Sequence, residues 1–147
     1  YTGKNITPKV TVKYKNITLR EGIDYKVVYK NNKKIGTAKI YVIGLNNFKD
    51  SNTYKMKIIP AKTKITKKKA TKKKITLKLK KVKGATGYQV MYSLKKNFKG
   101  KKKINTKKRT VVIKRKKSGK YYVKVRAYKK IGKKYVYGNY TKRITIK

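Results

Sequence analysis

The sequence predicts an all-β fold made of two small β-sandwiches. Nearly every apolar segment alternates hydrophobic and polar residues with a period of two, which is typical of half-buried strands. No segment sustains the 3.6-residue period of an amphipathic helix. Clusters of glycine and asparagine punctuate these segments as turns, and a series of short strands separated by turns is typical of sandwiches.

Four strands are predicted in the first part of the chain. Each places apolar residues at alternate positions, as in KVTVKY, YKVVY and AKIYVI. Turn signals lie between them at Glu21 and Gly22, at Asn31 and Asn32, and at residues 44–47. The predicted strands cover residues 10–14, 25–29, 38–43 and 54–59.

A second series of strands follows a lysine-rich stretch. Pro60 cannot donate a hydrogen bond to a sheet, so we expect it at the boundary between two domains. The next residues, AKTKITKKKATKKK, have little apolar content, and alternation resumes beyond them. We therefore place one domain at residues 1–61 and another at residues 62–147. The predicted strands of the second cover residues 75–79, 88–92, 111–113, 121–128 and 140–146.

Charge is the most unusual property of the composition. The 147 residues include 48 Lys and Arg but only 3 Asp and Glu, which gives a net charge of +45. The first 60 residues carry 13 of the cations and all three carboxylates, so the rest carries 35 cations and no acid. Such a field attracts polyanions, and salt screens that attraction. Repulsion between the cations opposes compaction of the chain.

The residue types exclude most catalytic chemistry. The chain has no His and no Cys, so it lacks the commonest general base, a thiol nucleophile, disulfides and thiolate metal ligands. Asp24 lies in a predicted turn, where we expect it to accept backbone hydrogen bonds. The carboxylates do not have the spacing of a calcium loop. We expect no enzymatic activity, no metal and no cofactor, and the apolar runs are too short to span a membrane.

The first domain resembles a known family. The segments YTGKNITPKVTV, LREGIDYKVVYKNN, IGTAKIYVIGLNNF and KMKIIPA follow one another as in the small immunoglobulin-like repeat of Gram-positive cell-surface proteins. The resemblance implies an Ig-like sandwich that acts as a spacer. It also implies an extracellular location, secreted or attached to the cell wall, within a larger surface protein.

The second domain resembles a fibronectin type III domain of the sort found in the same surface proteins. The matching segments are VKGATGYQVMYS, KYYVKVRAY and YGNYTKRITIK. Leu79 stands where that family usually has a core tryptophan. By this resemblance Tyr121 is the tyrosine-corner residue, whose hydroxyl bonds back to nearby backbone.

The cations of the second domain form the predicted polyanion-binding surface. The strand at residues 121–128 would present Lys124 and Arg126 on an exposed face, beside residues 89 and 91 of the neighbouring strand. Tyr122 and Tyr128 would flank the two cations. Lysines outnumber arginines by 43 to 5, which favours diffuse electrostatic contact over bidentate recognition of single phosphates or bases. The predicted residues are Lys101, Lys102, Lys103, Lys107, Lys108, Arg109, Arg115, Lys116, Lys117, Tyr122, Lys124, Arg126, Tyr128, Lys129, Lys130, Lys133 and Lys134.

Three interpretations of the charge remain open. Codons rich in A and T favour Lys, Asn, Ile and Tyr together, so lysine could simply fill solvent-facing positions. That does not account for the missing acids, because glutamate codons are also A-rich and ordinary surfaces mix both signs. The main hypothesis is a non-catalytic adhesion and stalk module that binds anionic polymers such as teichoic acid or acidic glycans. The alternative is a sequence-nonspecific nucleic-acid-binding module, in which the tyrosines either stack on bases or merely pack.

Overall fold

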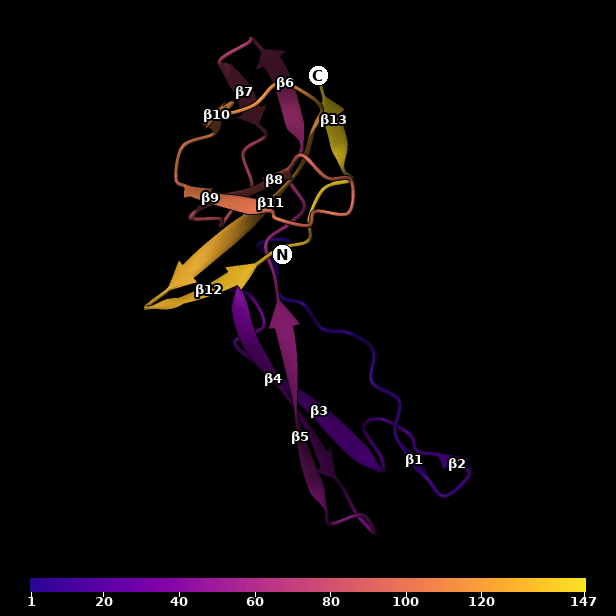
Figure 1. Cartoon of the computed structure of the whole chain (residues 1–147). Coiled ribbons are helices and arrows are strands. Elements are labelled where there is room, and N and C mark those ends of the chain that lie inside the picture. Colours follow the sequence, from indigo (N-terminus) through magenta and orange to yellow (C-terminus); the bar gives the residue numbers. More distant parts are fainter. The chain divides into compact units, whose positions relative to one another are not determined.

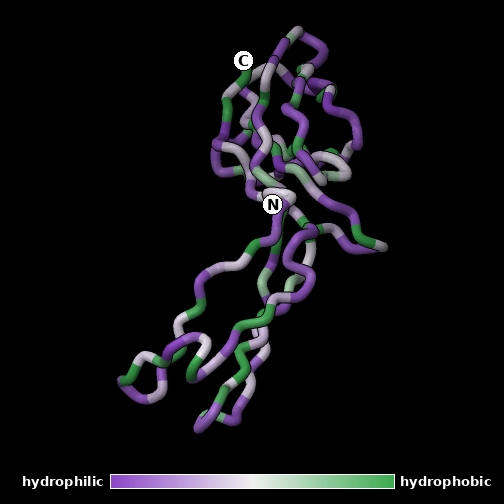
Figure 2. The backbone as a smooth tube through the Cα atoms, turned by 180° about the vertical axis from the view of Figure 1, so that it is seen from behind, coloured by the Kyte–Doolittle hydropathy of each residue, from purple (hydrophilic) through white to green (hydrophobic).

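The computed structural model describes all 147 residues and contains strands but no helix. The predicted all-β class is therefore confirmed. The chain divides into two compact units, Tyr1–Ile58 (unit 1) and Ile59–Lys147 (unit 2). Figure 2 shows hydrophilic and hydrophobic residues alternating along the chain in both units. No helix is present that is long and apolar enough to cross a membrane.

Unit 1 is built on one antiparallel sheet of three strands (Figure 1). β3 (Tyr25–Lys30), β4 (Gly36–Gly44) and β5 (Ser51–Ile58) pair in that order. β1 (Lys13–Tyr14) and β2 (Ile17–Thr18) form a separate short hairpin. The buried apolar residues of the unit are few: Tyr25, Ile35, Ala38, Val42 and Ile58.

The first predicted strand is present only as the two residues of β1. Two tyrosine side chains of β3 donate hydrogen bonds to backbone carbonyls of the segment that precedes β1. The Tyr25 hydroxyl donates to the Val10 carbonyl at 3.1 Å, and the Tyr29 hydroxyl donates to the Pro8 carbonyl. Phenol groups therefore hold this segment, and only the last two residues of the predicted strand form one.

Unit 2 places two antiparallel sheets around one core (Figure 1). The first sheet has the order β10 (Thr110–Lys114), β7 (Lys74–Leu79), β6 (Ile65–Ala70). The second has the order β12-β11-β8-β9, with β13 also paired to β11. Its strands are β8 (Gly87–Ser93), β9 (Lys102–Thr106), β11 (Tyr121–Ile131), β12 (Lys134–Tyr137) and β13 (Ile144–Ile146).

Alternate residues of the two sheets fill the core of unit 2. Ile75, Leu77 and Leu79 of β7 are each at most 1% exposed, and Val123 and Val125 of β11 are 0% exposed. All five belong to one cluster of buried side chains. The strands predicted from their alternation are present in β7, β8, β10 and β11. The arrangement is sandwich-like, because each sheet buries one face against the other.

Three strands of unit 2 are absent from the sequence prediction, and one is shorter than predicted. β6, β9 and β12 were not predicted, and β6 lies within the lysine-rich stretch after Pro60. The final strand was predicted from residue 140 but begins at Ile144. Just before it, Thr141 bonds to Val125 through both its backbone N–H and its hydroxyl, so the segment touches β11 without forming a continuous ladder.

Replacing Leu79 with Ala is expected to destabilise unit 2 by about 2–5 kcal/mol, because it removes buried methyl groups and leaves a cavity. Val112 lies on β10, which pairs with β7 in the same sheet, and its side chain is 48% exposed. Val112→Ala should therefore change the unfolding free energy by less than about 0.5 kcal/mol. Guanidinium unfolding followed by tyrosine fluorescence measures both values. Equal losses would contradict the shared core.

Candidate functional site

The lysines of the protein are almost all exposed. Of the 43 lysines, only Lys124 and Lys129 are half-buried. The three carboxylates all belong to unit 1, where Asp24 accepts a hydrogen bond from the Arg20 amide at 2.7 Å, as predicted for this turn. Asp24 also forms an ion pair with the Arg20 side chain at 3.6 Å. Unit 2 therefore presents its cations to solvent without any acidic side chain to offset them.

β11 carries the face on which the sequence placed a site. Lys124 and Arg126 alternate with buried core positions, so both side chains leave the core side of the sheet. Their partners on β8 are Met91 and Gln89, as predicted. Both cations are half-buried, however, and not fully open to solvent.

Aromatic rings enclose both of these cations. The Arg126 guanidinium carbon lies 3.8 Å from the Tyr137 ring centroid and 4.3 Å from the Tyr140 centroid. Lys124 Nζ lies 4.8 Å from the Tyr140 centroid and 4.6 Å from the Phe98 centroid. Cation–π contacts of this kind contribute about 0.5–2 kcal/mol each. We call this alternating set the aromatic–cation ladder: Tyr137, Arg126, Tyr140, Lys124 and Phe98.

Gln89, which is buried, fixes the ladder through hydrogen bonds. Its Oε1 accepts from Arg126 Nε at 2.9 Å and from the Tyr140 hydroxyl at 2.6 Å. Its Nε2 donates to Asn105 Oδ1 at 2.9 Å and lies 3.5 Å from the Tyr137 hydroxyl. Burial raises the pKa of Tyr140, although the positive charge of Arg126 opposes the shift. The Gln89 amide on β8 therefore connects β9, β11, β12 and the segment after β12.

Tyr128 is not the exposed flanking ring that the sequence predicted. It is 5% exposed, because Tyr135 and Tyr137 pack edge-on against it with centroids 5.1 and 6.0 Å away. A Cβ at Gly87 on β8 would lie 2.5 Å from the Tyr128 hydroxyl, so the ring fills the space above that glycine. Burial, with a smaller effect of the neighbouring phenols, raises the pKa of Tyr128. Tyr128 is a packing residue.

Two arginines outside the ladder are also held by the protein. Arg143 lies over the half-buried Tyr122 ring at 5.5 Å and donates to the Lys96 carbonyl at 3.2 Å. Tyr122, a predicted binding residue, is therefore covered on the side that Arg143 faces.

Arg115, another predicted binding residue, anchors the loop between β10 and β11 through hydrogen bonds to backbone carbonyls. Its guanidinium donates to the Thr71 carbonyl at 3.1 Å and to the Gly119 carbonyl at 3.0 Å, above the Tyr121 ring. The Tyr121 hydroxyl donates to the Lys117 carbonyl at 3.1 Å. This is the backbone hydrogen bond that the sequence analysis predicted for Tyr121.

The remaining predicted cations lie in separate groups. One precedes and begins β9, one forms the turn between β9 and β10, and one lies in the loop after β10. The last belongs to the β11–β12 hairpin, which extends beyond the rest of its sheet in Figure 1. In the same order, the groups are Lys101 to Lys103; Lys107, Lys108 and Arg109; Lys116 and Lys117; and Lys129, Lys130, Lys133 and Lys134.

Sequence reasoning missed most of the ladder. Tyr137 and Phe98 were not connected with Lys124 or Arg126, and Tyr140 was assigned only to the last strand. A signal for β12 was present, because YVY at residues 135–137 alternates in the manner of a strand. Pairing of Tyr137 with Tyr128 then brings that segment beside β11.

No protein-family model matches this chain, and no curated protein matches its sequence. The resemblance to Gram-positive surface domains therefore stays a prediction.

Replacing Gln89 with Leu is expected to destabilise unit 2 by about 1–3 kcal/mol, because Arg126 Nε and the Tyr140 hydroxyl lose a buried acceptor. Asn105→Ala is the control, since Asn105 is exposed and water can replace its amide oxygen. Thermal unfolding followed by near-ultraviolet circular dichroism compares the two variants. An equally small loss in both would mean that the Gln89 network does not stabilise the ladder.

Proposed function

We propose that this chain is a non-catalytic extracellular surface module, with an Ig-like and a fibronectin type III-like sandwich in tandem. It serves as a spacer and attaches electrostatically to anionic polymers such as wall teichoic acid or acidic glycans. The observation that carries the proposal is unit 2, which has 35 cations, no acidic side chain and nearly all of its lysines exposed. Such a surface attracts polyanions over distances of about a Debye length, near 10 Å in 0.1 M salt.

The distribution of the free cations favours contact that does not depend on a particular ligand sequence. The exposed groups are lysines on loops, turns and a hairpin, and each presents a mobile point charge. The arginines, which could recognise phosphate in a bidentate manner, are largely engaged, because Arg115, Arg126 and Arg143 bond to protein oxygens. Binding by the lysines then releases counterions, as on any polyelectrolyte.

The ring contacts favour attachment through charge alone over a module that stacks nucleic-acid bases on its tyrosines. Proteins that bind single strands without sequence preference stack successive bases on aromatic side chains. In unit 2 the rings near the predicted site already stack on the protein's own cations, as in Tyr137 and Tyr140 around Arg126. The most exposed tyrosines, Tyr14 and Tyr54, belong to unit 1. The charge alone therefore recruits the ligand.

Affinity for teichoic acid, heparin and single-stranded DNA of matched charge density is expected to be similar for all three. The logarithm of the binding constant should fall linearly with the logarithm of salt concentration, because counterion release drives the binding. Fluorescence anisotropy of labelled polymers measures the binding constant at each salt concentration. An affinity that is constant from low to high salt would refute the proposal, and a preference for DNA that survives high salt would support the nucleic-acid alternative.

The β11–β12 hairpin should contribute measurably to the salt dependence. Replacing its four lysines with glutamine is expected to reduce the slope for single-stranded DNA by about 0.7 for each lysine that contacts a phosphate. A matched variant with the same loss of charge in unit 1 should reduce the slope less, because that unit carries 13 cations against unit 2's 35. Equal reductions would mean that net charge alone matters. The hairpin set is Lys129, Lys130, Lys133 and Lys134; the control set is Lys26, Lys30, Lys39 and Lys55.

A further inference from the structure

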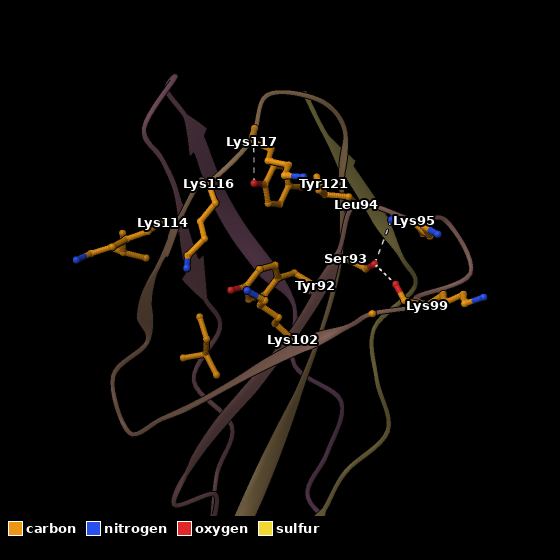
Figure 3. Close-up of a pocket in the computed structure, with 13 residues that line it drawn as sticks. Tyr92, Ser93, Leu94, Lys95, Lys99, Lys102, Lys114, Lys116, Lys117 and Tyr121 are labelled. Atoms are coloured by element: carbon orange, nitrogen blue, oxygen red, sulfur yellow. Dashed lines mark hydrogen bonds between the residues drawn. The ribbon is translucent and has the colours of Figure 1, made fainter.

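A groove of about 590 Å³ opens in unit 2 beside β8, β9 and β10. Figure 3 shows Tyr92 and Tyr121 in the middle of it. The two rings stack with centroids 6.3 Å apart and an interplanar angle of 28°. Burial, and then the neighbouring Tyr121, raises the pKa of Tyr92, which agrees with a ring set into an apolar surface. The groove does not include the aromatic–cation ladder.

The surface between the tyrosines and the solvent is apolar. Leu94 is 44% exposed and Val112 is 48% exposed, and both line the groove together with the half-buried Ile104. Large apolar side chains on a protein surface usually occur singly, whereas a hollow lined by several of them is typical of a binding site. The volume lies within the range of about 300–1,000 Å³ that small-molecule sites occupy.

Lysines border this apolar surface on the loops after β8 and β10 and on the strands β9 and β10. Figure 3 shows Lys114 on one side and Lys95 and Lys99 on the opposite side. Lysine stems lie along apolar surfaces while their ammonium groups remain in water, so they extend the apolar wall and place positive charge at its rim. No acidic side chain of unit 2 can neutralise that charge. The lysines are Lys95, Lys99, Lys102, Lys114, Lys116 and Lys117.

Hydrogen bonds hold the borders of the groove in place without a ligand. Ser93 Oγ donates to the Lys99 carbonyl at 2.8 Å and accepts from the Lys95 amide at 3.1 Å, which closes the loop after β8. On the opposite border, the Tyr121 hydroxyl holds the Lys117 carbonyl at 3.1 Å. A preformed site loses little conformational freedom when it binds.

We propose that this groove binds an anionic amphiphile of the fatty-acid class, with one unbranched hydrocarbon tail and one carboxylate head. The tail lies on Leu94, Ile104 and Val112, and the head lies among the rim lysines. Charge complementarity selects the sign of the head group, because six cations border the groove and no carboxylate does. This binding goes beyond the proposed attachment to polymers, because electrostatic attachment of teichoic acid or acidic glycans does not require an apolar groove.

Titration of the full chain with dodecanoate, below its micelle concentration, tests the proposal by amide chemical shifts. Dodecanoate is expected to shift the amides of β8, β9 and β10 that border the groove. Octanoate should bind at least about tenfold more weakly, because it buries fewer methylenes. Dodecyltrimethylammonium, with the same tail length and the opposite charge, should not shift these amides. If it shifts them as dodecanoate does, the proposal fails.

Variants separate the apolar and the charged contributions. Val112→Gln replaces apolar surface of the groove with a polar amide at unchanged net charge and should weaken dodecanoate binding several-fold. Val28→Gln is the matched control, because Val28 is 38% exposed on a strand of unit 1. Both positions are exposed enough to keep the fold, and an unchanged melting temperature verifies that. If the two variants bind dodecanoate equally well, the groove is not the site.

The charged rim is tested by two pairs of substitutions with the same loss of charge. Lys102→Gln with Lys116→Gln should weaken dodecanoate binding several-fold, whereas Lys67→Gln with Lys69→Gln on β6 should not. Equal weakening would mean a general electrostatic effect and would overturn the site. Val112→Gln, which keeps the charge, should leave the salt-dependent binding of teichoic acid intact. Failure of the groove is thus distinguishable from failure of polymer attachment.

Discussion

The shortage of carboxylates is the constraint on which the rest of this structure depends. In most domains an arginine that is partly withdrawn from water pairs with Asp or Glu, because a buried charge without partners is costly. Unit 2 has no such residue. Its half-buried Arg126 stacks between two tyrosines and donates to the Gln89 amide, while Arg115 donates to backbone carbonyls. Ring faces and neutral oxygens therefore carry out the role that carboxylates have elsewhere.

The same constraint divides the cations into two populations. Guanidinium groups are planar and weakly hydrated, so they can be partly buried among rings, and they accordingly hold β11 to the segments around it. Lysine ammonium groups hydrate strongly, and all but two of them remain exposed. The exposed lysines thus produce a large positive field at the surface. The arginines contribute hydrogen bonds and ring contacts that stabilise the fold. The proposed polymer attachment uses the exposed lysines, and the stability of the outer face uses the arginines.

Strands that bury one face were predictable, including the edge strand β10, whereas the exposed edge strands β6 and β9 were not. β7 and β11 alternate buried apolar with polar residues, which is the pattern that sequence reasoning detects. In β6 only Ile65 is even half-buried, and β9 is similarly exposed, so neither shows an apolar period. The partners of Lys124 and Arg126 could not be found for a related reason. Alternation tells which face of a strand a residue occupies, but not which distant ring covers it, and Tyr128 was misjudged for that reason.

The edges of the sheets in unit 2 have a further consequence, for solubility. An exposed edge strand offers unpaired backbone groups to other chains, and lysine at an edge discourages such pairing. β6 and β9 are edges, and they carry Lys67, Lys68 and Lys69, and Lys102 and Lys103. Each chain is thus kept apart from its copies by the same charge to which we attribute the proposed attachment to a polyanion. Under the proposed attachment, a polymer would neutralise that charge and remove the repulsion. Chains crowded on one polymer would then be able to associate edge to edge, which would link attachment to self-association.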